Sequence, residues 1–314
     1  MVLKFSQLRN FKAVVDAGAV RQAAKTLNLS QSSITKSIQQ LEDELGVKLL
    51  DRGAKGVAAT EAGKALVGRI KSIESELRHA RNDVEAIQGA GVGDIRVSVS
   101  PSVATGLLPS AVIAFQRKHP RVSLRVLEGV YPDMLPAIRT GDLDLAICLV
   151  PETPRDDSLR FVTLVRDRLV PAVRRDHPLL KRRKLKLAEL TGEPWIVYRR
   201  GRTGLDVFEQ TFVANGLSPP KAAIECASFA GALALVEKGD YLTLVPSQIF
   251  AGGRGASVLA PVLLDAPMQP WEVVAIARAG RDMSTVCAAF LTELSKAAAK
   301  IDAAVGGGRH PARR

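Results

Sequence analysis

Residues 23–42, AAKTLNLSQSSITKSIQQLE, decide how the N-terminal part of the chain folds. The first half is rich in alanine and typical of a short helix, which Asn28 and Ser30 interrupt before a second helix begins at Gln31. Ser30 can cap the first amides of the second helix, and the short break lets the two helices cross at a steep angle with Leu29 between them. The stretch therefore predicts a helix-turn-helix.

The second of these helices has two different faces. Its apolar residues recur at spacings of four, three and four, which indicates a core-facing side made of Ile34, Ile38, Leu41 and Leu45. The opposite side carries short hydrogen-bonding groups and a cation, as a helix in a DNA major groove requires near its N-terminal half. The DNA-binding candidates on this helix are Gln31, Ser32, Ser33, Thr35, Lys36 and Gln39. The alternative is an ordinary surface helix of an αα-hairpin.

From residue 11 to residue 66 the chain resembles the N-terminal region of LysR-type transcriptional regulators. The resemblance rests on an F-x-x-V start at Phe11 and on Gly18, Ala23-Ala24, Leu27, Ser30-Gln31, Ile38, Leu41-Glu42, Leu45-Gly46, Leu49-Leu50, Arg52, Val57, Thr60 and Ala62-Gly63. The departures are mild and lie at Ala19, Ser33 and Ala59. The resemblance implies a winged helix-turn-helix over residues 1–60. In it, the loop from Arg52 to Gly56 is the wing, and Arg52 and Lys55 contact phosphates or the minor groove.

A long linker helix is predicted over residues 61–90, after the capping residue Thr60. Apolar or small residues recur along it at alternating spacings of four and three, as in a heptad seam. This seam favours pairing with a second chain, although packing against its own domain would look similar. Pairing would duplicate the DNA-reading helix and predict an approximately palindromic site. The seam consists of the expected dimerisation residues Leu66, Ile70, Ile73, Leu77, Val84 and Ile87, together with Ala80.

The larger part of the chain, after GAGVGD at residues 89–94, alternates strands and helices. Ile95, Val97 and Val99 alternate with polar residues, and a helix is expected around Leu107 to Arg117. Further strand-like runs are VSLRVLE, LDLAICLV, LVPAVR, WIVY, YLTLVP and WEVVAIA. This alternation predicts α/β architecture for residues 91–300.

The resemblance extends weakly over this part and implies two lobes, similar to periplasmic solute-binding proteins. Lobe I would comprise residues 91–163 and 268–300, lobe II residues 164–267, and residues 301–314 a disordered basic tail. The fold class expected for the whole chain is therefore α+β and multidomain. It combines an N-terminal winged helix-turn-helix, a long linker helix and a C-terminal two-lobed α/β domain resembling periplasmic binding proteins.

A small-molecule effector is expected between the lobes, where strand ends and helix N-termini meet. The candidates are Ser100, Ser102, Thr105 and Glu128 on the first lobe and Arg200, Arg202, Thr203, Ser228 and Phe229 on the second. Guanidinium groups suit carboxylates or phosphates, so an organic anion is the first hypothesis. A solvated arginine cluster is an equally good interpretation of YRRGRTG, residues 198–204, and Glu128 would argue against an anion if it faced the cleft.

Charge and composition fit a DNA-binding protein without identifying one. The net charge is +12 and the pI is about 9.9, yet the most basic run, residues 166–186, is also typical of a solvated face. Cys148, Cys226 and Cys287 are widely spaced in apolar settings and are expected to be buried, reduced thiols. Neither the cysteines nor the histidines show metal-binding spacings, so the sequence predicts no metal and no cofactor.

Other classes of function find little support. No apolar stretch approaches the roughly 18 residues of a membrane helix, and the N-terminus lacks a signal-peptide pattern, so a cytoplasmic protein without a membrane partner is expected. The common catalytic fingerprints are missing, so an enzyme is not predicted. The sequence predicts a homodimeric or homotetrameric transcription regulator that binds double-stranded DNA specifically and responds to an effector. As an activator it would also contact RNA polymerase. The alternative is a cytoplasmic small-molecule receptor without a gene-regulatory role.

Overall fold

The computed structural model describes residues 3–53, 56–87, 92–150, 156–182, 185–198, 203–251, 257–265, 268, 270–280 and 282–306. The chain forms two compact units. The first comprises Met1–Arg78 with Thr140–Asp142, and the second comprises His79–Arg139 with Leu143–Arg314. Among the described residues, no helix combines the length and the apolar character needed to cross a membrane.

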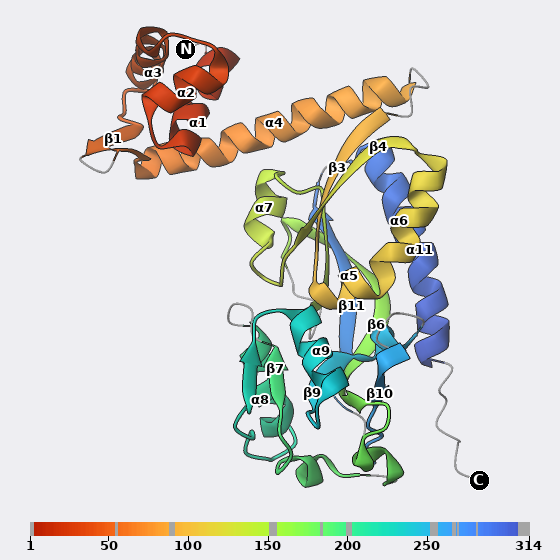
Figure 1. The fold of residues 1–314 in the computed structure, drawn as a ribbon. Coiled ribbons are helices and arrows are strands. Elements are labelled where there is room, and N and C mark those ends of the chain that lie inside the picture. Colours follow the sequence, from red (N-terminus) through yellow and green to blue (C-terminus); the bar gives the residue numbers. More distant parts are fainter. Residues whose placement is uncertain are drawn as a thin grey trace. The chain divides into compact units, whose positions relative to one another are not determined.

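The first unit packs helices around a small apolar core and adds a hairpin (Figure 1). Its elements are α1 (Phe5–Ala17), α2 (Val20–Leu27), α3 (Gln31–Leu45), β1 (Leu50–Gly53), β2 (Gly56–Ala59) and the first part of α4 (Glu61–Ile87). α1 ends at Gly18, whose left-handed φ of 65° suits glycine, and Ser30 is the N-cap of α3. The predicted helix-turn-helix is confirmed, with Ala23 and Ala24 buried as expected.

The prediction for Leu29 was wrong. Its side chain is 39% exposed instead of filling the space between α2 and α3. Asn28 takes a left-handed conformation at the end of α2, and the Leu29 amide donates a hydrogen bond to the Ala24 carbonyl. This closure ends α2 and leaves Leu29 at the surface, while Ile34 and Ile38 fill the core.

The seam predicted on α4 divides into a buried and an exposed part. Ile70 is fully buried in the core of the first unit, and Leu66 packs against the same core. The expectation that Ile70 faces a second chain is therefore wrong, because its own domain already covers it. The later seam residues are exposed, by 40% at Ile73, 53% at Leu77, 54% at Val84 and 86% at Ile87.

The second unit is built on a seven-stranded mixed sheet with the order β10-β6-β11-β5-β3-β4, in which β9 also pairs with β6. β3 runs parallel to β4 and β5, while β11 runs antiparallel to β5 and β6. The strands are β3 (Val92–Val99), β4 (Arg121–Glu128), β5 (Leu145–Val150), β6 (Leu159–Arg174), β9 (Thr243–Pro246), β10 (Leu259–Pro261) and β11 (Pro270–Arg278). A separate parallel pair is formed by β7 (Ile196–Tyr198) and β8 (Ile224–Cys226).

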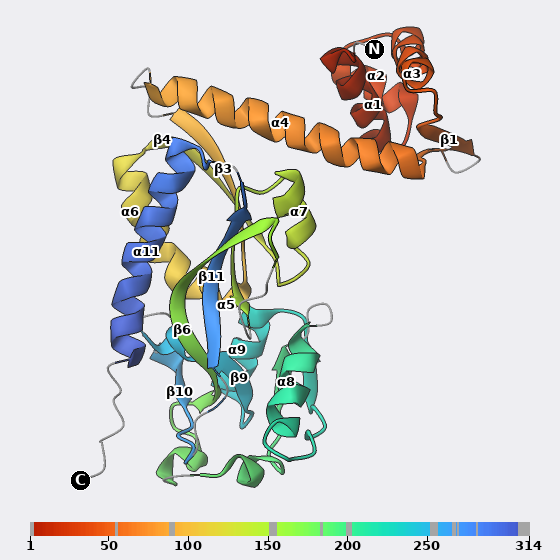
Figure 2. The same cartoon turned by 180° about the vertical axis from the view of Figure 1, so that it is seen from behind.

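Helices cover the sheet of the second unit, and Figures 1 and 2 show α6 and α11 side by side against one face of it. Val97, Phe115 and Phe290 are buried in the core between them. A second cluster, around Ile138 and Ile276, lies under α7. The helices are α5 (Pro101–Thr105), α6 (Leu107–Lys118), α7 (Leu135–Thr140), α8 (Thr203–Val213), α9 (Phe229–Lys238) and α11 (Thr285–Gly306), with short 3-10 turns η1 (Pro178–Lys181), η2 (Leu187–Leu190) and η3 (Ser247–Phe250).

The long strand β6 joins the two halves of this unit. Its first part, up to Arg168, pairs with β11, and from Leu169 onward it pairs with β9 and β10. The crossing expected near residue 163 is thus one continuous strand whose partners change after Arg168. Each strand-like run named from the sequence contains a strand, although three of them begin one or two residues before it, whereas the start of β6 and the strands β8 and β10 were missed.

The C-terminal helix is longer than expected. The sequence interpretation placed a disordered tail at residues 301–314, but α11 continues to Gly306. Ile301 is buried in the core beneath α6 and α11, and the alanines that follow it favour helix. The remainder of the predicted tail, residues 307–314, lies outside the described residues.

Candidate nucleic-acid interface and effector cavity

The start of α3 is held by a cluster of serine hydroxyls. Ser30 Oγ accepts a hydrogen bond of 3.1 Å from the Ser33 amide, as an N-cap should. The same oxygen lies 2.9 Å from Ser32 Oγ and 2.8 Å from Ser33 Oγ. The first turn of α3 is therefore fixed before any partner binds, and each hydroxyl retains hydrogen-bonding capacity for one.

The predicted DNA-binding residues of α3 lie away from its buried apolar face. Ile34, Ile38 and Leu41 are buried and fix the rotation of the helix. Of the predicted DNA-binding residues, Thr35 is half-buried, and the exposed ones are Gln31, Ser32, Ser33, Lys36 and Gln39. Gln40 is also exposed on this helix and was not among the candidates.

A two-stranded hairpin follows α3 at the position predicted for the wing. β1 and β2 pair with Arg52 opposite Val57, and the Val57 amide donates a 2.9 Å hydrogen bond to the Gly18 carbonyl at the end of α1. Arg52 lies in β1, whereas Lys55 lies outside the described residues. The contact with Gly18 fixes one strand of the hairpin to the helical core.

Glu42 joins α3 to the hairpin and was noticed in the sequence only as part of the family resemblance. Its carboxylate is buried and accepts hydrogen bonds from the Leu49 amide at 2.9 Å, the Leu50 amide at 3.3 Å and Lys48 Nζ at 2.7 Å. Burial alone would raise the pKa of Glu42, but these hydrogen bonds outweigh it and lower the pKa. An acidic residue beside the apolar stripe of α3 was the signal for this role.

The second unit contains a cavity of about 120 Å³ between its two halves. One side comes from the ends of β3, β5 and β11, and the other from β7, β9, α8 and α9. The residues lining it are Ser100, Pro101, Ser102, Val130, Tyr131, Leu149, Leu169, Ile196, Val197, Tyr198, Val207, Phe208, Phe229, Thr243, Leu244, Pro246 and Trp271. Pockets of this kind, mostly apolar with a few polar groups, are typical ligand sites.

Three of the predicted effector-binding residues line this cavity: Ser100, Ser102 and Phe229. Thr105 does not, because it is exposed and its hydroxyl donates to the carbonyls of Pro101 and Ser102 within α5. Ser228 instead caps α9 by accepting the Gly231 amide at 3.1 Å.

The remaining predicted effector residues are Glu128 and three residues between positions 200 and 203. Glu128 is exposed at the end of β4 and is not part of the cavity wall. Thr203 begins α8, but its side chain, like the whole of Arg200 and Arg202, falls outside what the structure describes. The arginine-based anion hypothesis thus has no support from the described part of the cavity.

Most of the cavity wall was missed from the sequence. Tyr198, Pro246 and Leu149 lie at or near the ends of runs recognised as strands, and Trp271 lies near the start of another. The sequence-based candidates were mostly polar or charged residues, whereas these wall residues are largely apolar strand ends. The position of strand ends at a lobe boundary was the available signal.

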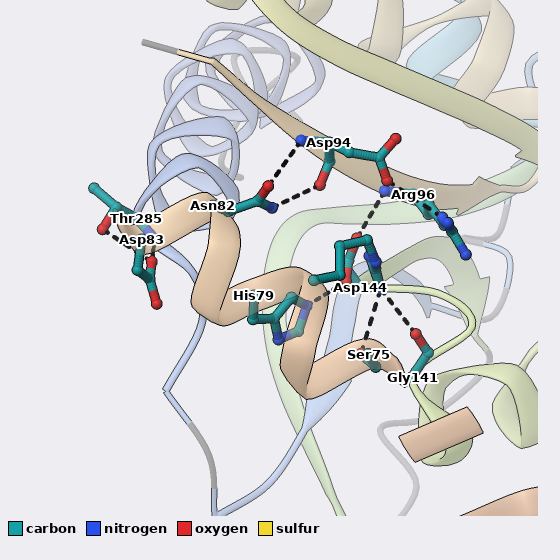
Figure 3. A network of polar contacts seen from close by, with 10 residues as sticks. Ser75, His79, Asn82, Asp83, Asp94, Arg96, Gly141, Asp144 and Thr285 are labelled. Atoms are coloured by element: carbon teal, nitrogen blue, oxygen red, sulfur yellow. Dashed lines mark hydrogen bonds and ion pairs between the residues drawn. The ribbon is translucent and has the colours of Figure 1, made fainter. Parts of the chain in front are cut away.

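The last turns of α4 are anchored to the second unit by polar contacts (Figure 3). His79 Nε2 lies 2.6 Å from Asp144 Oδ1, and Asp144 Oδ2 accepts the Arg96 amide at 2.7 Å. Asn82 forms two hydrogen bonds with the backbone of Asp94, at 3.0 and 3.2 Å. These contacts tie the end of α4 to β3 and to the residue just before β5.

Comparison with known protein families gives two matches. Residues 5–64 match a model described as a bacterial regulatory helix-turn-helix protein of the lysR family, and residues 88–299 match the LysR substrate binding domain. Together these matches cover the helix-turn-helix with its hairpin and the whole two-lobed unit.

Characterised relatives match over most of their length. The SDS degradation transcriptional activation protein of Pseudomonas sp. is 32% identical over 297 residues, which are 90% of this chain and 93% of that protein. The regulator PcaQ of Agrobacterium fabrum is 27% identical over 258 residues, 82% of this chain and 83% of PcaQ.

Solved structures show the same fold. The crystal structure of CbnR, a LysR family transcriptional regulator, matches with a TM-score of 0.66 and 24% identity, over 94% of this chain and 99% of CbnR. ArgP from Mycobacterium tuberculosis matches with a TM-score of 0.71 and 18% identity, over 95% of this chain and 98% of ArgP.

Proposed function

The chain belongs to the LysR family of bacterial transcription regulators, and from this premise we propose which of its residues read DNA and which bind the effector. The family assignment makes it a DNA-binding regulator with an effector-binding domain. The observation that carries the residue assignment is the exposed polar face of α3, presented by a serine-capped first turn.

In the proposed interface α3 enters a major groove. Gln31, Ser32, Ser33 and Thr35 face the base edges, because they occupy the first turns of the helix. Lys36 and Gln39 contact phosphates and neighbouring bases. Arg52 and Lys55, in the hairpin, contact the flanking backbone or minor groove, where a guanidinium or ammonium group gains from counterion release.

The effector is proposed to occupy the cavity between the two halves of the second unit. Ser100, Ser102 and Phe229 contribute to its wall from elements on both sides. A ligand there alters DNA binding only if it prefers one arrangement of the halves over another. The contacts of His79 with Asp144 and of Asn82 with Asp94 give that preference a direct connection to α4.

The same proposal extends to the domain boundaries, the pairing of two chains, catalysis and the location of the protein. Residues 1–60 form the DNA-binding domain, 61–90 the linker helix and 91–300 the effector-binding domain, and the exposed seam residues of α4 pair two copies of the chain. Family members are transcription regulators, and we expect no catalytic activity here. Because its partner is chromosomal DNA, the protein is proposed to act in the cytoplasm.

The test is fluorescence anisotropy with the full chain and two labelled duplexes, the DNA upstream of its own gene and a scrambled duplex of equal composition. Titration with salt separates charge attraction from base reading, since the non-specific part falls steeply with ionic strength. We expect the upstream duplex to bind at least about a hundredfold more tightly. Equal affinities for the two duplexes and for a panel of promoter fragments would contradict the proposal.

A further inference from the structure

The wall of the cavity is almost entirely apolar. Its described residues include no Lys, Arg, His, Asp or Glu side chain, and the polar groups that it offers are hydroxyls, an indole and the backbone. Burial raises the pKa of Tyr131, so this phenol also stays neutral at physiological pH. An ion entering this cavity would lose its hydration without gaining a charged partner among the described lining residues, which is unfavourable.

One buried polar atom in the wall makes no hydrogen bond to the described residues. Ser100 is 6% exposed, and its Oγ has no hydrogen-bond partner among the described residues. Buried hydroxyls are normally satisfied, and leaving one unpaired is unfavourable. Ser100 lies at the end of β3, where its side chain lines the cavity. A ligand that hydrogen-bonds to Ser100 Oγ would recover this cost.

An aspartate side chain is buried next to the cavity wall. Asp167 pairs with the lining residue Trp271 across β6 and β11, and it is 5% exposed. It accepts hydrogen bonds from Ser247 Oγ at 2.6 Å and from the amides of Arg168 at 2.7 Å and Gln248 at 3.3 Å. A carboxylate at this position repels an anion, and its protonated form would not attract one.

The cavity is small enough to limit the ligand. Its volume of about 120 Å³ is close to that of the engineered apolar cavity of about 150 Å³ that binds benzene. The aromatic rings of Tyr131, Phe229 and Trp271 line it, and such rings favour contact with another flat ring.

We propose that the effector enters this cavity as an uncharged, single-ring-sized apolar group whose one hydroxyl or carbonyl oxygen hydrogen-bonds to Ser100 Oγ. The inference rests on the proposed function, in which this cavity is the effector site, and it names another ligand class than the organic anion expected from the sequence. Selectivity comes from the apolar wall, which excludes ions, and from Ser100, which favours a ring bearing one hydrogen-bonding group over a plain hydrocarbon.

The test uses three probes of one ring each with the full chain at pH 7: benzyl alcohol, toluene and benzoate. Ligand-observed NMR titration and calorimetry give the dissociation constants. We expect benzyl alcohol to bind at least about tenfold more tightly than benzoate, because the carboxylate must be buried without a cation. Equal or tighter binding of benzoate, or no saturable binding of either neutral probe, would overturn the proposal.

Two variants assign the binding to this cavity. Ser100→Ala should weaken benzyl alcohol by about threefold to tenfold while leaving toluene unchanged. Ser110→Ala, which removes an exposed hydroxyl of α6 that donates to the Leu107 carbonyl in its own helix, is the matched control and should change neither. Val207→Trp fills the cavity from a half-buried position on α8 and should abolish both. Binding that survives Val207→Trp in a folded protein would place the site elsewhere.

The DNA assay distinguishes this proposal from the proposed function. Selective binding to upstream DNA by a chain that binds none of the neutral probes would refute the ligand class and leave the regulator standing. Saturable binding of benzyl alcohol with the Ser100 dependence, by a chain that shows no selective DNA binding, would support the ligand class and refute the DNA-reading assignment.

Discussion

His79 on α4 and Asp144 at the start of β5 lie 2.6 Å apart, and this contact joins the end of the linker helix to the sheet of the effector-binding domain. Both side chains are largely buried, at 17% and 3% exposure. Asp144 also accepts the Arg96 amide on β3, so one carboxylate ties α4 to two strands. The same two strands carry residues of the cavity wall at their other ends.

Replacing His79 with leucine should therefore weaken this anchor. We expect the free energy of unfolding to fall by about 1–3 kcal/mol, because the buried Asp144 carboxylate loses a charge-assisted hydrogen bond. Urea unfolding followed by circular dichroism measures the change. Arg81→Leu on the same helix is the control: Arg81 is 79% exposed, so the loss of its solvent-screened pair with Glu85 should cost much less stability. Equal losses in the two variants would show that the anchor adds no stability.

Glu42 should make the stability of the first unit depend on pH. Its pKa is lowered in the folded protein, so its contribution is present above the unfolded value near 4.5 and is lost as the pH falls through the folded pKa. Glu42→Gln should cost about 1.5–3 kcal/mol at pH 7, and the difference from the parent should shrink toward pH 3. Denaturant unfolding across this range is the measurement. Glu44→Gln, at an exposed position of α3, should show no such trend.

The sequence predicted the first unit in more detail than the second for physical reasons. A capped helix-turn-helix depends on local signals such as Ser30, Gly18 and the stripe of Ile34 and Ile38, all of which lie within a few residues of the elements they define. The roles of Glu42 and Ile70 could not be predicted from such local signals, because they depend on which residues pack against these two side chains. The seam of α4 has one period along its length, and only the folded core shows that Ile70 is already covered.

The cavity was harder to predict because its residues come from many separate elements. Ser100 and Ser102 were found because polar residues follow an alternating strand, whereas Tyr131 and Trp271 have the same local pattern as ordinary core residues. The start of β6 was missed because charged and apolar residues mix there, and buried and exposed side chains do not alternate regularly along it. Arg200 and Arg202 were proposed for their charge, and this stays a prediction because both lie outside the described residues.

Substitutions on α3 and the hairpin should separate base reading from charge attraction. Gln31→Ala or Thr35→Ala should reduce the preference for operator over random DNA, since each base contact is worth about 1–3 kcal/mol. Lys36→Ala or Arg52→Ala should weaken binding to both duplexes and lower the salt slope by about one unit. Anisotropy titrations at several salt concentrations measure both effects. Lys64→Ala, an exposed cation of α4 outside the proposed interface, is the control; unchanged binding in the first four variants would exclude this surface.

The exposed stripe of α4 should hold two copies of the chain together. Ile73→Asp and Leu77→Asp place a charge where 40% and 53% of an apolar side chain is exposed, so they should yield folded monomers in sedimentation-velocity runs. Ser72→Asp, on the same helix and beside the stripe, should remain dimeric. Ile70→Ala should behave differently, because it removes a fully buried side chain from the core of the first unit. It should cost about 2–5 kcal/mol of stability in that unit without adding a charge to the pairing surface. Intact dimers in both aspartate variants would show that this helix pairs through another face.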